Sequence, residues 1–416
     1  MSRSLSMPLP VDARKHGLVG EGNIDQPAFT AAQHGAGRDN HLADITFAHF
    51  EVDGSGVWTQ EYDALAKGIG LQYVLRGRFS DLFVHDTAAT GFGCDFLQDT
   101  LVEGVLAERC GRQDPGERMG GAGTGIGVGG WSMVERLTIT ARTAVGNGTN
   151  GIFVELQKEH WPPPRGIRIT ACHVEDNRFG ISDWGADGLL VTSSTMLTNH
   201  EAGFDVSSQG TSGVGGRGGI VTGCVIDGNV RDGLGIGSTP GPYAFRGNRI
   251  SNNGRRAAPA ASGGGDGVRF SRLSMIDENA DWPPDGHRGK QLTVGAQHAV
   301  VTFNTETELR LAPVRPGSGT AWIDGTPTPG SPYRLPGSPA PRAGITTAAT
   351  VCGPHMHSNR IWDDQRPRTQ THALWITHEG SWRDGRVVGN DFRDNASAAT
   401  RFDTAPVNGR WHDNES

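Results

Sequence analysis

The stretch CVIDGNVRDGLGIGS (residues 224–238) carries two patterns that recur along the chain. Its head has a small or polar first residue, an apolar residue two places on and Asn or Asp five places on. That pattern reappears in CHVEDN (172–177), STMLTN (194–199), NRISNN (248–253), NRIWDD (359–364) and NDFRDN (390–395). Repeats of about 20 to 50 residues indicate a protein built from stacked units.

The tail of the same stretch is a glycine followed by alternating residues. It recurs as GIGLQ (68–72), GFGCD (91–95), GIGVG (125–129), GIFVE (151–155), GISDW (180–184), GFDVS (203–207), GLGIG (233–237) and GVRFS (267–271). Positions one and three after glycine are mostly Phe, Ile, Leu or Val, which is the period of a strand with one buried face. Successive glycines lie 23 to 34 residues apart, so a core of nearly fixed length alternates with loops of variable length.

Three short strands per repeat would fill this period, and the turns between them are rich in Asn, Gly and Asp. We therefore predict an all-β fold, a single-stranded right-handed parallel β-helix, or solenoid. The row expected to stack inside it consists of Val174, Met196, Ile226 and Ile250. The ladder expected at a turn consists of Asn177, Asn199, Asn229 and Asn253. A β-sandwich is the alternative, but it does not explain why each position recurs from coil to coil.

The composition fits a narrow core with many turns. The chain has 416 residues, of which 62 are glycine and only 35% are hydrophobic. Its formal net charge is −7, from 38 basic and 45 acidic residues. This balance argues against nucleic acid or an anionic membrane as the partner.

Five cysteines without a CxxC spacing predict neither a disulfide framework nor a zinc site. Cys172 and Cys224 occupy the same repeat position and are expected to be small buried residues. We expect no cofactor and no metal. The N-terminus lacks the apolar core of a secretory signal, which predicts a protein that works in the cytoplasm or is released with a virion.

Four regions are expected along the chain. Residues 1–39 would form an N-terminal cap, because a β-helix end exposes its core and an unpaired strand edge. Residues 40–273 would form coils. Residues 274–343 interrupt the repeat with alternating segments and a Pro- and Gly-rich return, which predicts an inserted β-rich region acting as a lid or a subunit contact. Residues 344–416 would complete the coils and the C-terminal cap.

The outward side chains of the glycine-anchored strands define two columns of the predicted sheet. The column two places after glycine reads Gly70, Gly93, Gly127, Phe153, Ser182, Asp205, Gly235 and Arg269. The column four places after glycine reads Gln72, Asp95, Gly129, Glu155, Trp184, Ser207, Gly237 and Ser271. Small residues make the floor of a shallow groove, and a second excursion, LQKEHWPPPRG (156–166), is expected to overhang it.

Three carboxylates, Asp95, Glu155 and Asp205, project into this groove beside the flat side chains of Trp184 and Phe153. Sugars stack on aromatic faces, and carboxylate pairs supply the acid and the base or nucleophile of glycoside hydrolysis. The groove therefore favours a polysaccharide or oligosaccharide ligand. The plainer interpretation is that exposed carboxylates on a solenoid are solvated or stabilise turns.

Two consecutive motifs, GLGIGSTPG (233–241) and DGVRFSR (266–272), resemble those of the polygalacturonase-like glycoside hydrolases, a family of right-handed parallel β-helices. The resemblance implies that Arg269 binds substrate and that Asp205 and Asp183 are the catalytic aspartates. Asp232 stands where the family has His, and Ser271 stands where it has Lys. Asp183 lies 22 residues before Asp205, about one coil, but three places after its glycine, which is nominally an inward position.

More broadly, the chain resembles the pectate-lyase-like superfamily, which includes phage tail spikes and alginate epimerases. We therefore expect a carbohydrate-active protein, a glycoside hydrolase or lyase acting on an acidic polysaccharide. The first alternative is a non-catalytic tail or fibre protein that binds polysaccharide, for which a homotrimer is expected by resemblance. The second is a cytosolic enzyme that uses the groove on a small metabolite.

Overall fold

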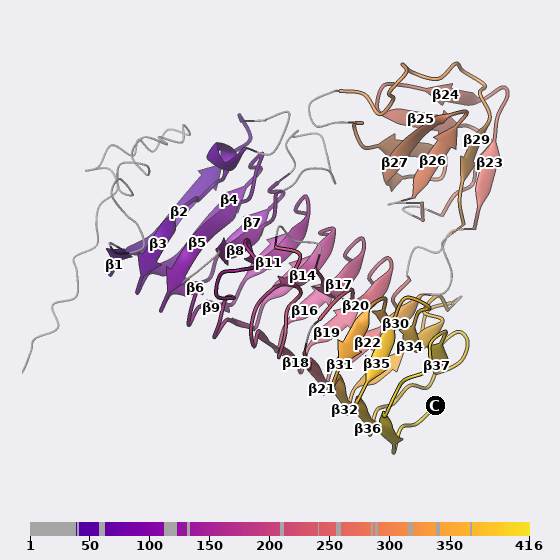
Figure 1. Ribbon diagram of the computed structural model, residues 1–416. Coiled ribbons are helices and arrows are strands. Elements are labelled where there is room, and N and C mark those ends of the chain that lie inside the picture. The colour runs from indigo at the N-terminus through magenta and orange to yellow at the C-terminus, as the bar shows by residue number, and fades with distance from the viewer. Residues whose placement is uncertain are drawn as a thin grey trace, which may run out of the picture.

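The computed structural model describes residue 39 and the ranges 41–57, 63–111, 123–130, 134–208, 212–239, 241–254, 259–283, 286–287, 290–314, 319–337, 342–366 and 368–416. Apart from Asp39, the expected N-terminal cap lies outside the described residues. The described chain winds into a long parallel solenoid, with a smaller antiparallel sheet beside it (Figure 1). The predicted all-β solenoid with a β-rich insertion is confirmed.

One face of the solenoid is an eleven-stranded parallel sheet, here called the glycine sheet. Its strands are β1 (Leu42–Ala43), β3 (Gln72–Leu75), β5 (Phe92–Gln98), β8 (Ile126–Gly130), β11 (Asn150–Leu156), β14 (Phe179–Trp184), β17 (Ala202–Val206), β20 (Asp232–Ile236), β30 (Ala343–Thr347), β34 (His372–Ile376) and β37 (Thr400–Phe402). Each strand pairs in parallel with the strand one coil away.

The remaining faces form an eighteen-stranded parallel sheet, here called the long sheet, to which most coils contribute two short strands. Its first strands are β2 (Thr46–Asp53), β4 (Arg78–His85), β6 (Leu101–Glu103), β7 (Leu106–Glu108), β9 (Thr138–Thr140), β10 (Thr143–Val145), β12 (Arg168–Thr170), β13 (His173–Glu175), β15 (Leu190–Thr192) and β16 (Thr195–Leu197). Those that follow are β18 (Ile220–Thr222), β19 (Val225–Asp227), β21 (Ala244–Arg246), β22 (Arg249–Ser251), β32 (His355–His357), β33 (Arg360–Trp362), β36 (Arg386–Val388) and β38 (Arg410–His412).

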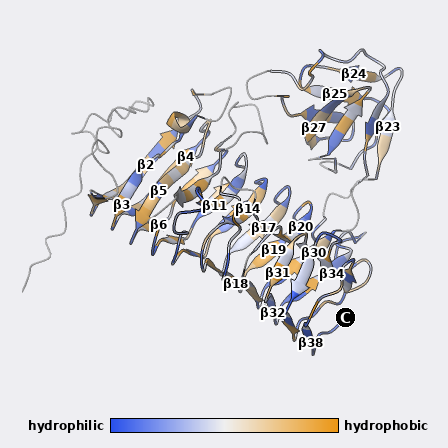
Figure 2. Cartoon of the chain, viewed as in Figure 1, coloured by the Kyte–Doolittle hydropathy of each residue, from blue (hydrophilic) through white to orange (hydrophobic). Residues whose placement is uncertain are grey.

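The predicted interior row is confirmed. Val174 is in register with Met196, Met196 with Ile226, and Ile226 with Ile250. All four side chains are fully buried. Apolar residues recur in this way on every coil (Figure 2), and together they form one continuous core along the solenoid.

The predicted asparagine ladder is also confirmed. The side-chain amide of Asn177 donates to Oδ1 of Asn199 (3.2 Å), Asn199 to Asn229 (3.0 Å), and Asn229 to Asn253 (3.0 Å). Each Oδ1 also accepts the backbone N–H of the preceding ladder residue. The ladder extends beyond the prediction, to Asn147 at one end and, through Gln370, to Asn395 at the other.

A second ladder, which the sequence prediction missed, runs through the last coils at the bend that follows the first short strand of the long sheet in each of them. Asn248 donates to Asn359 (2.9 Å), Asn359 to Asn390 (2.8 Å) and Asn390 to Asn414 (2.9 Å). Cys224 caps it, donating its backbone N–H to Asn248. Cys172 and Cys224 are buried and free, as their repeat position predicted.

The insertion is a seven-stranded antiparallel sheet with its own buried core. Its strands are β23 (Ala261–Gly263), β24 (Val268–Phe270), β25 (Ser274–Asp277), β26 (Gln291–Val294), β27 (Gln297–Asn304), β28 (Glu308–Leu311) and β29 (Tyr333–Leu335). The expected boundary at 273/274 is therefore wrong, because residues 261–273 already belong to the insertion. A further pair, β31 (Thr350–Cys352) and β35 (Ser381–Arg383), lies among the last coils.

The strand predicted at 267–271 shows why the boundary was misplaced. Its alternation is real, but β24 pairs antiparallel with β25 instead of stacking on a coil. Strand β20 pairs with β30 across the insertion, and β22 pairs with β33. No helix among the described residues has the length and apolarity needed to span a membrane.

The interior row can be tested with two neighbouring substitutions on β19. Ile226→Asp should abolish soluble folding, because an unpaired buried charge costs several kcal/mol, which is on the order of the stability of a domain. Val225→Asp should remain soluble and melt cooperatively, because Val225 faces outward and is only partly buried. Solubility and melting temperature are the measurements. A soluble, cooperatively melting Ile226→Asp protein would contradict the register.

Candidate functional site

The outer face of the glycine sheet has the two predicted columns over most of its length. In one column Gly93, Gly127, Phe153, Ser182, Asp205 and Gly235 are in register on successive strands. In the other column Gln72, Asp95, Gly129, Glu155 and Trp184 are in register. After Gly235 the first column continues with Thr346, Trp375 and Arg401, and not with Arg269.

Glycines occupy several positions of these columns, and the name groove is kept below for this outer face of the glycine sheet. A Cβ atom at Gly129 would lie 3.4 Å from Oδ1 of Asp95, and one at Gly235 would lie 3.6 Å from Oδ1 of Asp205. Both carboxyl groups therefore lean over a neighbouring position that has no side chain. The space over Gly235 leaves room beside Asp205. A Cβ atom at Gly129, in contrast, would lie 3.1 Å from the Glu155 carbonyl oxygen and 3.3 Å from the Gln157 amide nitrogen, so Asp95 is crowded.

Asp205 is nearly buried, with 9% of its surface exposed. The indole Nε1–H of Trp184 donates to its Oδ2 at 2.7 Å. Burial raises the pKa of Asp205 to about 7, although the bond from Trp184 acts in the opposite direction. A carboxyl group with this pKa holds a proton near neutral pH, as a general acid requires.

Trp184 is the centre of an aromatic platform. Its indole meets the ring of Phe153 edge to face, with centroids 4.9 Å apart and planes at 86°. Ser182 lies between Phe153 and Asp205 in the same column, is fully buried, and accepts a hydrogen bond from the Asn150 amide. The Trp184 indole therefore contacts the Phe153 ring on one side and the Asp205 carboxyl group on the other, although Ser182 separates these two residues in their column.

Asp95 and Glu155 flank Gly129 in the other column. The Lys67 ammonium lies 4.0 Å from Asp95, and both side chains are mostly buried. The Gln157 amide approaches the same carboxyl group at 3.5 Å. Burial raises the pKa of Asp95, Lys67 lowers it and Glu155 raises it further. Asp95 and Glu155 thus form a pair of carboxyl groups at this end of the groove, with the Lys67 ammonium beside Asp95.

Asp183 faces the interior of the solenoid, the side that its repeat position indicated. Its carboxyl group is fully buried and accepts hydrogen bonds from the backbone N–H groups of Gly185 (3.2 Å) and Ala186 (2.8 Å) and from the Tyr243 hydroxyl (3.0 Å). Burial raises its pKa to about 7. The structure therefore does not bring Asp183 and Asp205 together on the groove, and Asp183 holds the turn after β14.

Asp232 and Arg269 also lie apart from the carboxyl groups of the groove. Asp232 Oδ1 accepts from the backbone N–H of Ala343 (3.1 Å) and from the Thr346 hydroxyl (2.7 Å), which ties β20 to β30. Arg269 is on β24 in the insertion, where it pairs with Glu278 and is largely exposed. The expected column position of Arg269 is wrong, because Thr346 occupies it.

The sequence prediction missed four groove residues, namely Lys67, Gln157, Thr346 and Trp375. Thr346 had a signal, because Gly344 is followed by the same alternation as the other anchoring glycines. Lys67 directly precedes Gly68, but only the fold shows that its side chain reaches across to Asp95. Trp375 gave no such signal, because Ala373 stands two places before it where the other strands have glycine. Its indole donates to Asp403 (2.9 Å).

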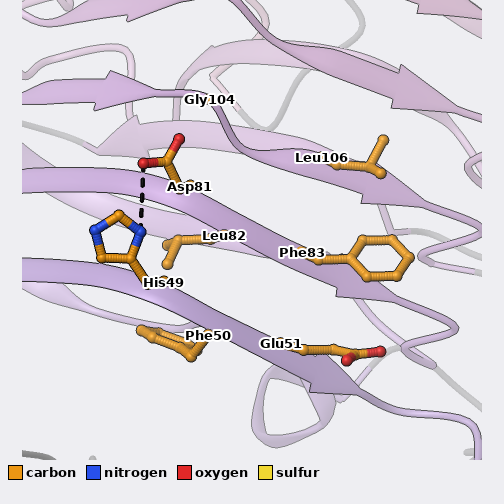
Figure 3. Close-up of a pocket in the computed structure, with 8 residues that line it drawn as sticks. All are labelled: His49, Phe50, Glu51, Asp81, Leu82, Phe83, Gly104 and Leu106. Carbon is orange, nitrogen blue, oxygen red and sulfur yellow. Dashed lines mark ion pairs between the residues drawn. The ribbon is translucent and has the colours of Figure 1, made fainter.

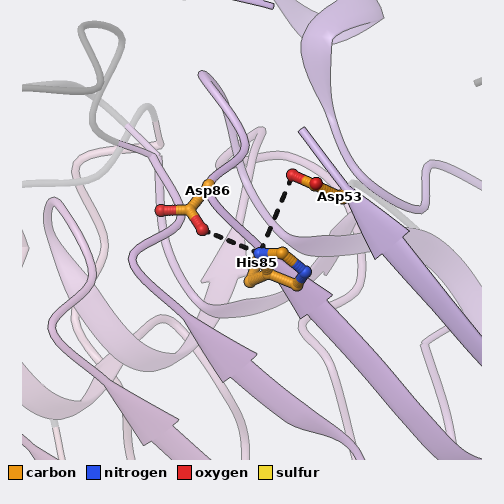
Figure 4. A group of neighbouring side chains, drawn as sticks. All are labelled: Asp53, His85 and Asp86. Carbon is orange, nitrogen blue, oxygen red and sulfur yellow. Dashed lines mark hydrogen bonds and ion pairs between the residues drawn. The ribbon is translucent and has the colours of Figure 1, made fainter. Parts of the chain in front are cut away.

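A different cluster lies at the N-terminal end of the long sheet (Figure 4). His85 bonds Asp86 through Nδ1 (2.7 Å) and Glu51 through Nε2 (2.8 Å), and Asp53 is 3.8 Å from Nδ1. Arg109 donates to both oxygens of Asp86, and this bond lowers the pKa of Asp86 to about 2. Burial lowers the pKa of His85, but its bonds to Asp86 and Glu51 outweigh burial and raise it.

Asp53, His85 and Asp86 form the one group found in the described part of the chain whose ligand atoms could share a metal ion. Arg109 already donates to both oxygens of Asp86, so these residues are satisfied by their ion pairs without a metal ion. A shallow depression of about 570 Å³ lies next to them (Figure 3), lined by His49, Phe50, Glu51, Asp81, Leu82, Phe83, Gly104 and Leu106. Its His49–Asp81 ion pair (3.4 Å) is largely exposed to solvent, and the depression is separate from the groove.

Comparison with known proteins supports the fold. A family model described as the right-handed β-helix region matches residues 158–273. No curated protein matches the chain. The expected right-handed parallel β-helix fold is therefore confirmed.

Solved structures with this fold are distant. The periplasmic alginate epimerase AlgG is 12% identical with a TM-score of 0.39, over 82% of this chain and 51% of AlgG, so the chain spans about half its length. The Streptococcus pneumoniae surface adhesin PfbA is 9% identical with a TM-score of 0.44, over 97% and 93% of the two chains. Tailspike protein 3 of bacteriophage CBA120 is 10% identical with a TM-score of 0.34, over 95% and 61%. The structural neighbours thus include an enzyme, an adhesin and a tailspike.

The buried carboxyl group of Asp183 predicts a specific dependence of stability on pH. The folded protein keeps this proton up to about pH 7, whereas an unfolded aspartate loses it near pH ~3.9. Between these values the folded state binds more protons, so the free energy of unfolding should fall as the pH rises from about 4 to 7. Asp183→Asn keeps an acceptor for the backbone N–H groups and should remove a substantial part of this fall.

Urea denaturation at several pH values between 4 and 8 measures the effect. Asp413→Asn is the matched control, because the Asp413 side chain is 80% exposed, and it should leave the pH dependence as in the parent protein. An equally steep fall in Asp183→Asn and in the parent would contradict the assignment of a protonated Asp183.

Proposed function

We propose that the outer face of the glycine sheet binds a polysaccharide chain, and that Asp205 is the proton donor for cleavage of a glycosidic bond. The observation that carries the proposal is the nearly buried Asp205, with a pKa near 7, bonded to the indole of Trp184 and leaning over Gly235. A proton donor, a flat apolar face and an open floor are thus adjacent. These are the elements that a sugar ring needs for stacking and for general acid catalysis.

The proposed step is a hydrolysis. A sugar ring stacks on Trp184, and Asp205 gives its proton to the glycosidic oxygen as the bond from that oxygen to the anomeric carbon breaks. Water adds to the anomeric carbon, and Glu155 takes the proton that the water loses. The departing sugar leaves as an alcohol, and a proton moves from Glu155 back to Asp205 through solvent.

The register supports an inverting outcome. Glu155 is on β11 and Asp205 is on β17, two strands away, so their backbones lie at least about 9.6 Å apart. Inverting glycosidases place their carboxyl groups roughly 6.5–9.5 Å apart to admit a water molecule, whereas retaining enzymes need about 5 Å. This backbone separation fits the wider spacing and not the narrower one.

The cations near the groove do not select one charge for the substrate. Arg269, the cation expected to bind a uronate, lies in the insertion, and Lys67 is close to Asp95. Arg401 stands over the ring of Trp375 at the far end of the column. Neutral and uronate-containing polysaccharides therefore both belong in the substrate panel.

Cleavage assays on such a panel, with reducing ends and unsaturated products as readouts, test the proposal. Asp205→Asn should lower kcat by at least about 100-fold with little change in melting temperature, because the donor is lost while the shape is kept. The parent kcat/KM should fall as the pH rises above about 7, where Asp205 loses its proton. Glu175→Gln, on the outer face of the long sheet, is the matched control and should leave turnover unchanged.

Two results would contradict the catalytic role. One is full activity in Asp205→Asn. The other is the absence of any product from the parent protein across the panel. In that second case, binding that depends on Trp184 would identify the groove as a non-catalytic carbohydrate site, and the absence of both would remove the groove as a functional site.

A further inference from the structure

Another charged surface lies on the long sheet, in the last four coils. It contains five exposed arginines, here called the basic strip: Arg246, Arg249, Arg360, Arg386 and Arg410. All five occupy outward positions on short strands whose middle residues are buried or partly buried. The strip lies in a chain with a net charge of −7, so it is a local concentration of positive charge against the overall balance.

The register stacks like charges directly on one another. Arg386 is paired with Arg410, one coil further on. Arg249 is paired with Arg360. Neighbouring strands are about 4.8 Å apart, and like charges directly opposite each other destabilise a sheet. The packing of the fold does not require these charges, because the outward positions of earlier coils include Thr138, Leu190 and Ile220.

Most of this charge is not compensated within the part of the chain that the structure describes. Arg360 lies 3.5 Å from Asp391. Arg246, Arg249, Arg386 and Arg410 have no ion pair with a described carboxylate. Arginines earlier in the solenoid differ, since Arg76 pairs with Asp44 at 2.7 Å and Arg178 with Glu201 at 2.9 Å. An external anion is the partner that the basic strip lacks.

One aromatic residue is part of the same surface. Trp362 lies beside the strip, and the guanidinium groups of Arg249 and Arg360 stand 5.5 Å and 4.6 Å from the centre of its ring. These contacts hold both planar groups in fixed positions on the sheet. An arginine oriented in this way is ready to form two parallel hydrogen bonds with a carboxylate or sulfate.

From these observations we infer that the basic strip binds an anionic polysaccharide lying along the solenoid axis, with its acidic groups facing the stacked arginines. The ligand is an extended polymer because the arginines lie on four successive coils. Arg246, Arg386 and Arg410 are on one side of the bend that carries the second ladder, and Arg249 and Arg360 are on the other. Nucleic acid fits less well, because single strands need free aromatic faces for their bases and the face of Trp362 is approached by arginines. The site is on a different sheet from the groove, so it does not depend on the proposed cleavage.

Binding of polygalacturonate oligomers at low salt tests this inference. The triple variant Arg246→Gln, Arg386→Gln and Arg410→Gln should raise Kd at least about tenfold. The control triple variant is Arg76→Gln, Arg136→Gln and Arg178→Gln. It also removes three positive charges, but from arginines that already have carboxylate partners, so it should change Kd by less than about twofold. Added salt should weaken binding to the parent, as expected for exposed charges.

Three further arms make the result decisive. In a Trp184→Ala background, the three strip substitutions should raise Kd by the same factor as in the parent. This result would show that the strip binds independently of the groove. Neutral dextran should not compete, and oligothymidylate should bind more weakly than polygalacturonate. The strip variant should melt at the same temperature as the parent or higher, because like-charge contacts are removed.

Several outcomes would overturn the inference. Equal losses in the two triple variants would indicate a general charge effect. Tighter binding of oligothymidylate would identify the strip as a nucleic acid site, and no binding of polygalacturonate to the parent would leave it without this ligand. A clear drop in the melting temperature of the strip variant would assign the arginines to the fold.

Discussion

The asparagine ladder is the interaction on which the rest of the structure depends. Each ladder Oδ1 accepts both the side-chain amide and the backbone N–H of the residue one coil before, so one asparagine fixes the height and the rotation of the next coil. A shift by one residue would break both bonds and turn every side chain to the opposite face of the sheet. The buried row from Val174 to Ile250 acts in the same direction, because the same shift would turn its apolar side chains toward solvent.

Fixed register makes an outward column a place where chemistry can be assembled from distant parts of the sequence. Trp184 reaches Asp205 because β14 and β17 are neighbours, and Glu155 stands beside Trp184 because β11 precedes β14. Gly235 keeps the position next to Asp205 open. The burial that raises the pKa of Asp205 to about 7 comes from the same packing, so the acid strength of the site is a consequence of the stacking.

Most of the fold could be predicted from the sequence because each coil repeats one pattern. The interior row, the ladder and the two columns, up to Gly235 in one and Trp184 in the other, follow from the spacing of glycine and asparagine and from the apolar alternation between them. Arg269 shows the limit of that pattern, since alternation predicts a strand but not its partner, and β24 pairs within the insertion. Asp183 shows another limit, because its inward position was evident but its hydrogen bond to Tyr243, 60 residues later, depends on the coil dimensions.

The basic strip could not be predicted for a related reason. Arg246 and His357 are neighbours in register, yet 111 residues separate them, and the insertion lies between them. The coils on either side nevertheless meet directly, since Asn248 donates to Asn359 and Asn253 to Gln370. The insertion therefore leaves from one bend without interrupting either ladder. Because both ladders continue past the insertion, the outward faces of the two sheets continue as well. The groove and the basic strip therefore each contain residues from both sides of the insertion.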